Sequence, residues 1–192
     1  MLLGIVSDIH CNAEGLANAI AAMNSVGRLD RLVCLGDCIY DYRFSNEVVA
    51  LLRDHDAAVI QGNHEETFYS PAGVRARAVP WIDPGHFEWL AARPHQMMIE
   101  AAGRKVLAVH STPWEPRGTY VHPKSRELER FGTAPADVVL YGHTHVQVVK
   151  QIGSVLVINP GSAGEARDPG NGRRLSCAVL DVASCSAQII DY

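Results

Sequence analysis

Side chains that can bind metal ions follow the first apolar run of the chain. Residues 2–6 comprise four apolar residues and one Gly, which predicts a short strand in a sheet covered on both faces. Asp8 and His10 come just after this run. Because side chains alternate along a strand, we expect both to point to the same side. An Asp-x-His pair is also typical of a helix N-cap beside a surface His, so its meaning depends on the rest of the chain.

Candidate ligands recur in the same position after the later apolar runs at 31–35, 57–60, 105–109 and 137–141. The full set is Asp8, His10, Asp37, Asn63, His110, His143 and His145. One zinc ion takes four ligands, so seven suit two octahedral or five-coordinate ions that share one carboxylate. Oxygen and imidazole donors without thiolate favour Mn, Fe, Zn, Ni or Co. The other histidines that follow no buried strand are interpreted as surface residues: His55, His86, His95 and His122.

The elements that must position these ligands alternate between strand and helix. Apolar residues at helical spacing predict helices from the N-cap Asn12 to Ser25, over 46–54 and over 125–131. The apolar runs predict strands, and further antiparallel strands are predicted at 147–150, 154–158, 176–181 and 187–191. Open α/β sheets place their sites at the carboxyl ends of strands, which is where the candidate ligands stand.

Residues 66–103 interrupt this alternation. Pro and Gly residues separate short segments with an apolar side, so we predict a small helical cap inserted into a single domain spanning 1–192. Trp81 and Trp89 are interpreted as packing residues of this cap rather than as groups that stack on a substrate.

Composition narrows the class of protein. The chain has 192 residues, enough for one domain with its own core, and a net charge of −4. Its basic residues form isolated pairs, which argues against strong nucleic-acid binding. No apolar stretch reaches the ~20 residues of a membrane span, and the start lacks the pattern of a signal peptide. Five cysteines without a Cys-x-x-Cys motif predict a reduced, cytoplasmic protein.

Five motifs in this order resemble the calcineurin-like metallophosphoesterase superfamily. They are Asp8-Ile9-His10, Gly36-Asp37, Gly62-Asn63-His64-Glu65, His110 and Gly142-His143-Thr144-His145. Small size and the segment Asn159-Pro160-Gly161-Ser162 resemble the compact bacterial and archaeal phosphodiesterase branch. The resemblance implies a four-layer α/β/β/α sandwich of two mixed sheets, with a dinuclear metal site at its edge.

The resemblance also implies a role for each matching residue. The first metal would be held by Asp8, His10 and His145, and the second by Asn63, His110 and His143. Asp37 would bridge the two ions, and His64 would face the leaving group without being a ligand. We therefore expect a small phosphoester substrate, two divalent transition metal ions with Mn favoured, and attack on phosphorus by a metal-bridging hydroxide. Phosphodiesters are the favoured substrates.

The sequence departs from the family pattern near the ligands. Cys11 and Ser111 stand where Gly is common, residues 38–45 replace a loop rich in Gly and Pro, and no Arg stands directly after Asp41. Because of these departures, the family pattern does not identify the substrate. Alternatives are a phosphomonoesterase or protein phosphatase with the same site, a nuclease, and a non-catalytic scaffold like the small retromer subunit. A homo-oligomer also remains open. Arg43 and Arg117 are candidates to reach a substrate phosphate but are interpreted as solvated loop charges.

Overall fold

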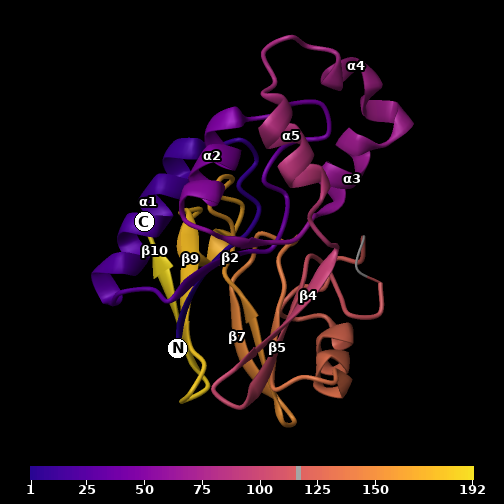
Figure 1. The fold of residues 1–192 in the computed structure, drawn as a ribbon. Helices are drawn as coiled ribbons and strands as arrows, with labels where there is room; N and C mark the ends of the chain where they lie inside the picture. Colours follow the sequence, from indigo (N-terminus) through magenta and orange to yellow (C-terminus); the bar gives the residue numbers. More distant parts are fainter. Residues whose placement is uncertain (116–117) are drawn as a thin grey trace.

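The first of two five-stranded sheets carries the amino-terminal ligands. The computed structural model describes residues 1–115 and 118–192 (Figure 1). The first sheet has the order β10-β9-β1-β2-β3, in which β1, β2 and β3 are parallel and β9 and β10 are antiparallel to their neighbours. Its strands are β1 (Leu2–Val6), β2 (Arg31–Cys34), β3 (Ala58–Val59), β9 (Ser176–Asp181) and β10 (Ser186–Asp191).

The second sheet carries the histidine ligands of the later motifs. Its order is β4-β5-β6-β8-β7, with β5, β6 and β8 parallel and the two edge strands antiparallel. Its strands are β4 (Gln96–Ala101), β5 (Arg104–Val109), β6 (Val138–Leu140), β7 (Val148–Ile152) and β8 (Val155–Asn159). The antiparallel pairs β7–β8 and β9–β10 confirm the antiparallel strands predicted near the end of the chain.

Helices cover the outer face of each sheet. The first sheet is covered by α1 (Ala13–Val26) and α2 (Asn46–Asp54). The helices α3 (Asn63–Tyr69), η1 (Pro71–Gly73), α4 (Val74–Arg77) and α5 (Pro84–Ala91) follow along the chain, and residues of α3 and α5 join the same apolar cluster. The second sheet is covered by the 3₁₀ helix η2 (Arg126–Thr133), while η3 (Pro169–Asn171) lies in a loop. Apolar clusters fill the space between the sheets and beneath each outer layer. The predicted four-layer α/β/β/α sandwich is therefore confirmed.

Helix α1 shows how local sequence sets these elements. The Asn12 side chain accepts a hydrogen bond from the Gly15 backbone N–H at 2.8 Å, and this capping starts the helix. Leu16, Ile20 and Met23 lie on one face and are buried against the sheet. Each such side chain contributes about 1.5–3 kcal/mol to the free energy of unfolding.

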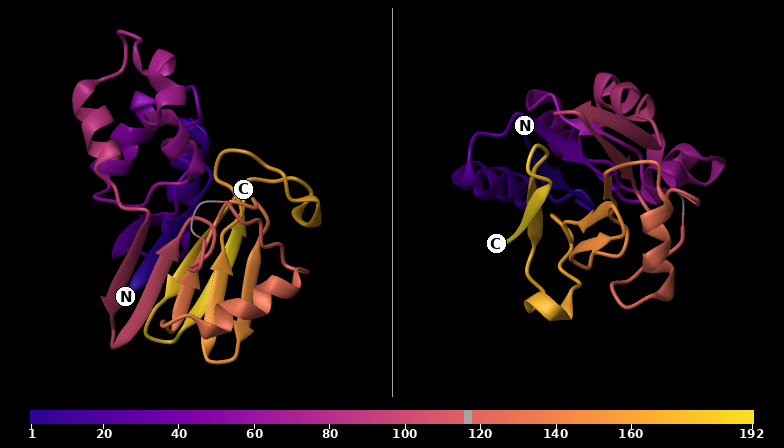
Figure 2. Two further views of the ribbon diagram at one scale, coloured as in Figure 1. Left: turned by 90° about the vertical axis from the view of Figure 1, so that its right-hand side faces the viewer. Right: turned by 90° about the horizontal axis from the view of Figure 1, so that it is seen from below.

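The predicted cap is helical over only part of its range. Helices α3 to α5 end at Ala91, and residues 96–101 form strand β4, which pairs with β5 along its whole length. The sequence pattern of β4 is weak because only Ile99 of this edge strand is fully buried. The helical segment lies above the strand ends (Figure 2) and packs into the core beneath α2 through Phe68 and Leu90.

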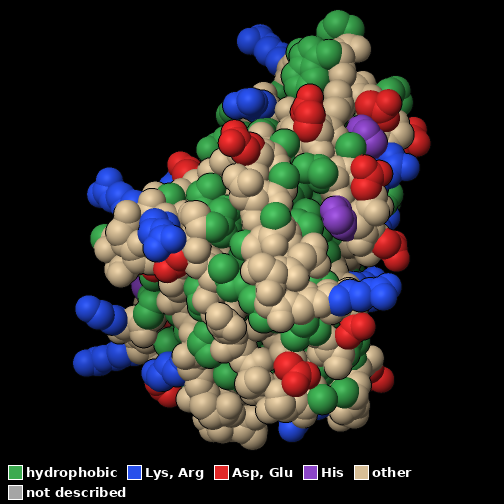
Figure 3. All heavy atoms as spheres, turned by 90° about the vertical axis from the view of Figure 1, so that its left-hand side faces the viewer, with side chains coloured by type: hydrophobic (Ala, Val, Ile, Leu, Met, Phe, Trp, Pro, Cys, Tyr) green, Lys and Arg blue, Asp and Glu red, His purple; other side chains and the backbone are tan. Residues whose placement is uncertain are grey.

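Two features bear on the expectations about membranes and surface charge. No helix among the described residues is long and apolar enough to cross a membrane. On the face shown in Figure 3, Lys and Arg side chains lie apart and are interspersed with Asp and Glu.

The five cysteines are free, and two of them lie beside predicted ligands in the sequence, Cys11 after His10 and Cys38 after Asp37. Cys38 Sγ lies 3.5 Å from Cys34 Sγ, whereas Cys11 Sγ donates to the Arg43 carbonyl at 3.2 Å. The contact with Cys34, together with burial, raises the pKa of Cys38 well above its ordinary value. Burial raises the pKa of Cys11 to about 11. Both thiols stay protonated at neutral pH, so they react slowly with oxidants.

Candidate metal centre

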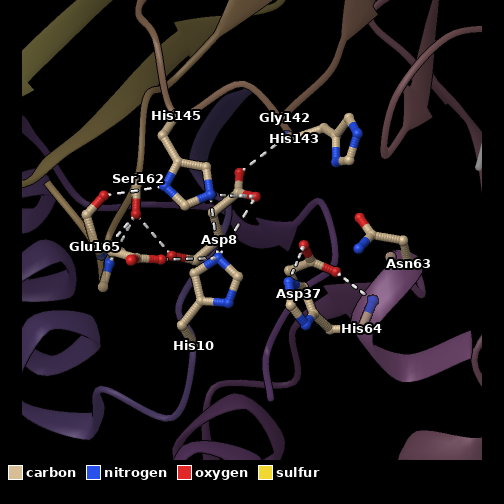
Figure 4. A network of polar contacts seen from close by, with 12 residues as sticks. Asp8, His10, Asp37, Asn63, His64, Gly142, His143, His145, Ser162 and Glu165 are labelled. Carbon is tan, nitrogen blue, oxygen red and sulfur yellow. Dashed lines mark hydrogen bonds and ion pairs between the residues drawn. The ribbon is translucent and has the colours of Figure 1, made fainter. Parts of the chain in front are cut away.

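The carboxyl ends of β1, β2, β3, β5 and β6 meet at one edge of the sandwich and bring the predicted ligands together (Figure 4). The buried members of the set are Asp8, His10, Asp37, His110, His143 and His145, and Asn63 is half-buried. All seven predicted ligands thus lie in the same region, although they come from both sheets. The site is built from loops that follow strands rather than from the strands themselves.

Several of these residues adopt a backbone conformation that is rare outside Gly. The φ angles of Asp8, His10 and Asp37 are 53°, 49° and 52°, and those of His143 and His145 are 65° and 57°. Strand β1 ends at Val6, so the reason given above for the convergence of Asp8 and His10 is wrong. Left-handed turns, not strand alternation, direct both side chains into the site. Such strained residues cluster where the surrounding structure holds them for function.

The first group of ligand atoms comprises Asp8, His10 and His145. Nε2 of His10 and Nε2 of His145 lie 3.1 Å apart, and Asp8 Oδ1 lies 3.3 Å from the latter nitrogen. The other ring nitrogen of His145, Nδ1, donates to the Glu165 carbonyl at 3.0 Å, which leaves Nε2 free to face the site. A Cβ added at Gly142 would collide with Ser7 Oγ, so only Gly lets these loops approach this closely.

The second group comprises Asp37, His110 and His143, with Asn63 beside them. His110 Nε2 lies 3.2 Å from Asp37 Oδ2 and 3.0 Å from Asn63 Oδ1. Its Nδ1 donates to the Leu35 carbonyl at 2.7 Å, so Nε2 is the nitrogen presented to the site. The rings of His110 and His143 are 5.0 Å apart.

Asp37 links the two groups, because its carboxylate also lies close enough to the ring nitrogens of His10 and His64 to share a metal ion with them. His64 Nε2 is 3.8 Å from Asp37 Oδ2, and the His64 backbone N–H donates to Asp37 Oδ1 at 3.0 Å. The position of Asp37 between the groups fits the predicted bridging carboxylate. His64, predicted to be no ligand, is nevertheless placed by the structure in a metal-capable group.

Burial and neighbouring charges set the protonation of the site. Burial, outweighing the attraction of Asp8, lowers the pKa of His10 to about 4. Burial and the charge of His110 lower the pKa of His143 to about 4, so both imidazoles keep a lone pair for a metal at neutral pH. Burial opposes ionisation of Asp8, but its contacts with His145 and His110 hold its pKa below the usual range. Likewise burial opposes protonation of His110, but Asp37 raises its pKa to about 10.

The side chains of this site are suited to binding a metal ion. Asp8 Oδ1 and His143 Nε2 are buried and lack a hydrogen-bond partner among the described residues. Leaving buried polar atoms without partners costs about 1–3 kcal/mol each, unless another group such as a cation satisfies them. Two buried carboxylates among imidazoles also make a negative site that favours cations. The donor set is the oxygen and nitrogen mixture preferred by divalent transition metals.

Glu65 organises the loop that carries Asp37, a role that its sequence position did not reveal. Its buried carboxylate accepts hydrogen bonds from the backbone N–H groups of Asp37, Cys38, Ile39 and Gly62, at 2.7–3.1 Å. Burial and the nearby charge of Asp37 raise its pKa to about 7. The four N–H donors offset the cost of its charge and thereby hold the Asp37 backbone in its left-handed turn.

Replacing Glu65 with Gln is expected to lower the free energy of unfolding by about 2–4 kcal/mol. The amide group would place N–H donors against backbone N–H donors and leave about two of them unsatisfied. Chemical denaturation followed by circular dichroism measures the change. Glu100→Gln makes the same chemical change on the exposed edge of β4 and should alter stability by less than about 0.5 kcal/mol. Equal stability of the two variants would show that Glu65 does not organise the loop that carries Asp37.

Asp41 is a second residue whose role the sequence did not reveal. Its Oδ1 lies 2.9 Å from His64 Nδ1, and its backbone N–H is 3.1 Å from the same nitrogen. Asp41 therefore fixes the orientation of the His64 ring. Arg43 is exposed in the same loop, and Arg117 lies outside the described residues.

Comparisons with known proteins agree with this geometry. The family model described as "Calcineurin-like phosphoesterase superfamily domain" matches residues 1–184. An uncharacterized protein of Methanocaldococcus jannaschii is 26% identical, with 98% of this chain and 86% of that protein aligned. A phosphodiesterase of the same organism is also 26% identical, over 84% of this chain and 83% of its own length. The metallophosphoesterase of Sphaerobacter thermophilus shares the fold, with a TM-score of 0.78 at 22% identity over 100% of this chain and 88% of that one.

The matched region contains every motif of the site and ends beyond the last predicted ligand. Members of this family typically bind divalent metals, and the chain carries the His and Asp groups suited to them. This chain belongs to the calcineurin-like phosphoesterase superfamily.

Proposed function

We propose that the chain is a phosphodiesterase that works with two divalent transition metal ions, Mn being favoured. The observation that carries this proposal is the position of Asp37 between two ligand groups, one with Asp8, His10 and His145 and the other with His110 and His143. One carboxylate placed between two sets of buried ligands suits a pair of ions better than a single ion.

The residues divide into those that would hold metal and those that would act on the substrate. Asp8, His10 and His145 would hold one ion, Asn63, His110 and His143 the other, and Asp37 both. When bound, such a pair supplies positive charge for phosphate oxygens and lowers the pKa of a nearby water to yield a nucleophile. Hydrogen bonds to the carbonyls of Leu35 and Glu165 keep the rings of His110 and His145 turned toward the site.

His64 would act as the general acid. Its ring is 22% exposed at the rim of the site, with Nε2 directed toward Asp37 and Nδ1 held by Asp41. From that position Nε2 would donate a proton to the oxygen of the departing alcohol, which leaves poorly as an alkoxide. The similarity to a curated phosphodiesterase supports diesters as the substrates of this site.

The test is metal content together with a substrate screen. Elemental analysis of the chain after purification and Mn loading should approach two ions per chain. The loaded protein should hydrolyse bis-(p-nitrophenyl) phosphate faster than p-nitrophenyl phosphate, which has the same leaving group. One ion per chain would contradict the dinuclear site, and a preference for the monoester would reassign the substrate. Full metal content without hydrolysis of any phosphoester would favour the scaffold alternative.

A further inference from the structure

A cavity of about 640 Å³ lies beside the metal centre and shares a wall with it. Three loops form it: residues 120–124 after β5, residues 143–146 after β6 and residues 167–170 after β8. His143 belongs both to this lining and to the second ligand group. A phosphate held at the metal centre would therefore have one of its substituents at the mouth of this cavity.

One wall of the cavity is aromatic. The ring of Tyr120 stacks on that of His143, with centroids 3.8 Å apart and planes 27° apart. The ring of His122 lies nearly parallel to that of Tyr120, at 14°, with centroids 6.3 Å apart. Tyr120 is 56% exposed although it is a large aromatic residue, and Val146 and Pro169 add apolar surface to the lining. Such a wall offers ring faces to a planar group.

Charged side chains of both signs complete the lining of the cavity. Lys124 and Arg167 line it and are exposed. The acidic lining residue, Asp168, is turned into its own loop, where its carboxylate accepts the backbone N–H groups of Gln147 and Gly170. Arg167 is held at the rim by Glu165, at 2.7 Å, so its position is set before a ligand arrives.

We propose that this cavity binds the base of a nucleotide-derived phosphodiester, with stacking on Tyr120 as the main contact. The assignment rests on the proposed function, because it takes the substrate phosphate to lie at the metal centre. Nucleoside phosphate esters carry such a planar group, and their sugar separates the base from the phosphate. Stacking of bases on aromatic side chains tolerates any base, so the site would select for the presence of a base rather than for its identity.

The test compares two ligands that differ only in the base. The 5′-methylenephosphonate analogues of AMP and of ribose 5-phosphate carry a CH₂ group in place of the ester oxygen, so neither can be hydrolysed. Titration calorimetry with the Mn-loaded full chain should give a Kd about tenfold lower for the adenosine compound. Tyr120→Ala should remove this difference, and Tyr120→Phe should keep it because the ring face remains. Trp81→Ala is the matched control, since Trp81 is 53% exposed and lies outside the cavity.

Equal affinity of the wild-type chain for the two analogues would overturn the assignment, as would a base preference that survives Tyr120→Ala. These outcomes are independent of catalysis. A chain that hydrolyses bis-(p-nitrophenyl) phosphate but shows no base preference refutes the cavity assignment alone. A chain that shows the preference but hydrolyses no phosphodiester refutes the proposed reaction and leaves the binding site standing.

Discussion

Asp37→Asn is expected to lower kcat/KM by about 10³-fold or more at modest metal concentrations. The change removes a negative charge from a position between the two ligand groups and so weakens both. A loss of several kcal/mol of charge stabilisation corresponds to three or more factors of ten in rate. The fold should persist, because the amide oxygen can still accept the His64 backbone N–H that now donates to Asp37 Oδ1. Hydrolysis of bis-(p-nitrophenyl) phosphate and elemental analysis measure the two effects.

Asn63→Ala is the matched comparison for this variant. It removes a neutral proposed ligand from the second group only, beside His110. We therefore expect a smaller loss of activity than for Asp37→Asn, with better recovery when Mn is added in excess. Near-normal turnover of Asp37→Asn at modest metal concentrations would show that Asp37 is not the bridge.

His64→Gln is expected to separate proton donation from metal binding. Because a general acid is worth about 10²–10⁴ in rate, the variant should lose that much on a diester with an alkyl leaving group. The loss should be much smaller on bis-(p-nitrophenyl) phosphate, since nitrophenolate departs without a proton. Both metal ions should remain bound. Rates on the two substrates, with metal content measured on the same preparation, test this.

The metal content of His64→Gln matters because His64 lies within ligand distance of His10 and Asp37. Loss of an ion would show that His64 is a ligand and that our assignment of the site is wrong. An equal loss of rate on both substrates would indicate that His64 stabilises phosphate charge instead of donating a proton.

Asp41→Asn gives an independent test of the same role. Asp41 contacts His64 Nδ1 at 2.9 Å and orients the ring. The neutral amide weakens this contact by removing the negative charge, so the variant should reproduce part of the leaving-group dependence of His64→Gln. Metal content should not change. Asp54→Asn, on an exposed position at the end of α2, should leave both rates unaltered. If Asp41→Asn lost the same fraction of its rate on both substrates, Asp41 would have only a structural role.

Local sequence was enough to predict most elements and the composition of the site. Helix α1 carries its start signal in Asn12 and its buried face in residues at helical spacing, so both can be read without knowing the fold. Every candidate ligand comes shortly after an apolar run, which is again a local pattern. Strand β4 escaped prediction because it lies at an edge and buries little, and its hydrogen bonds to β5 are what make it a strand.

The sequence by itself determined which residues could bind metal, and only the tertiary structure decided how they meet. His10 and His145 are 135 positions apart, yet their Nε2 atoms lie 3.1 Å from each other because the two sheets pack face to face. The left-handed turns at Asp8 and Asp37, the four N–H groups on Glu65 and the contact of Asp41 with His64 likewise depend on long-range packing. Residue types and spacing encode donor chemistry and local periodicity. Distances between donors arise only when separate strands, each stabilised by burial of its own apolar residues, are brought to a common edge.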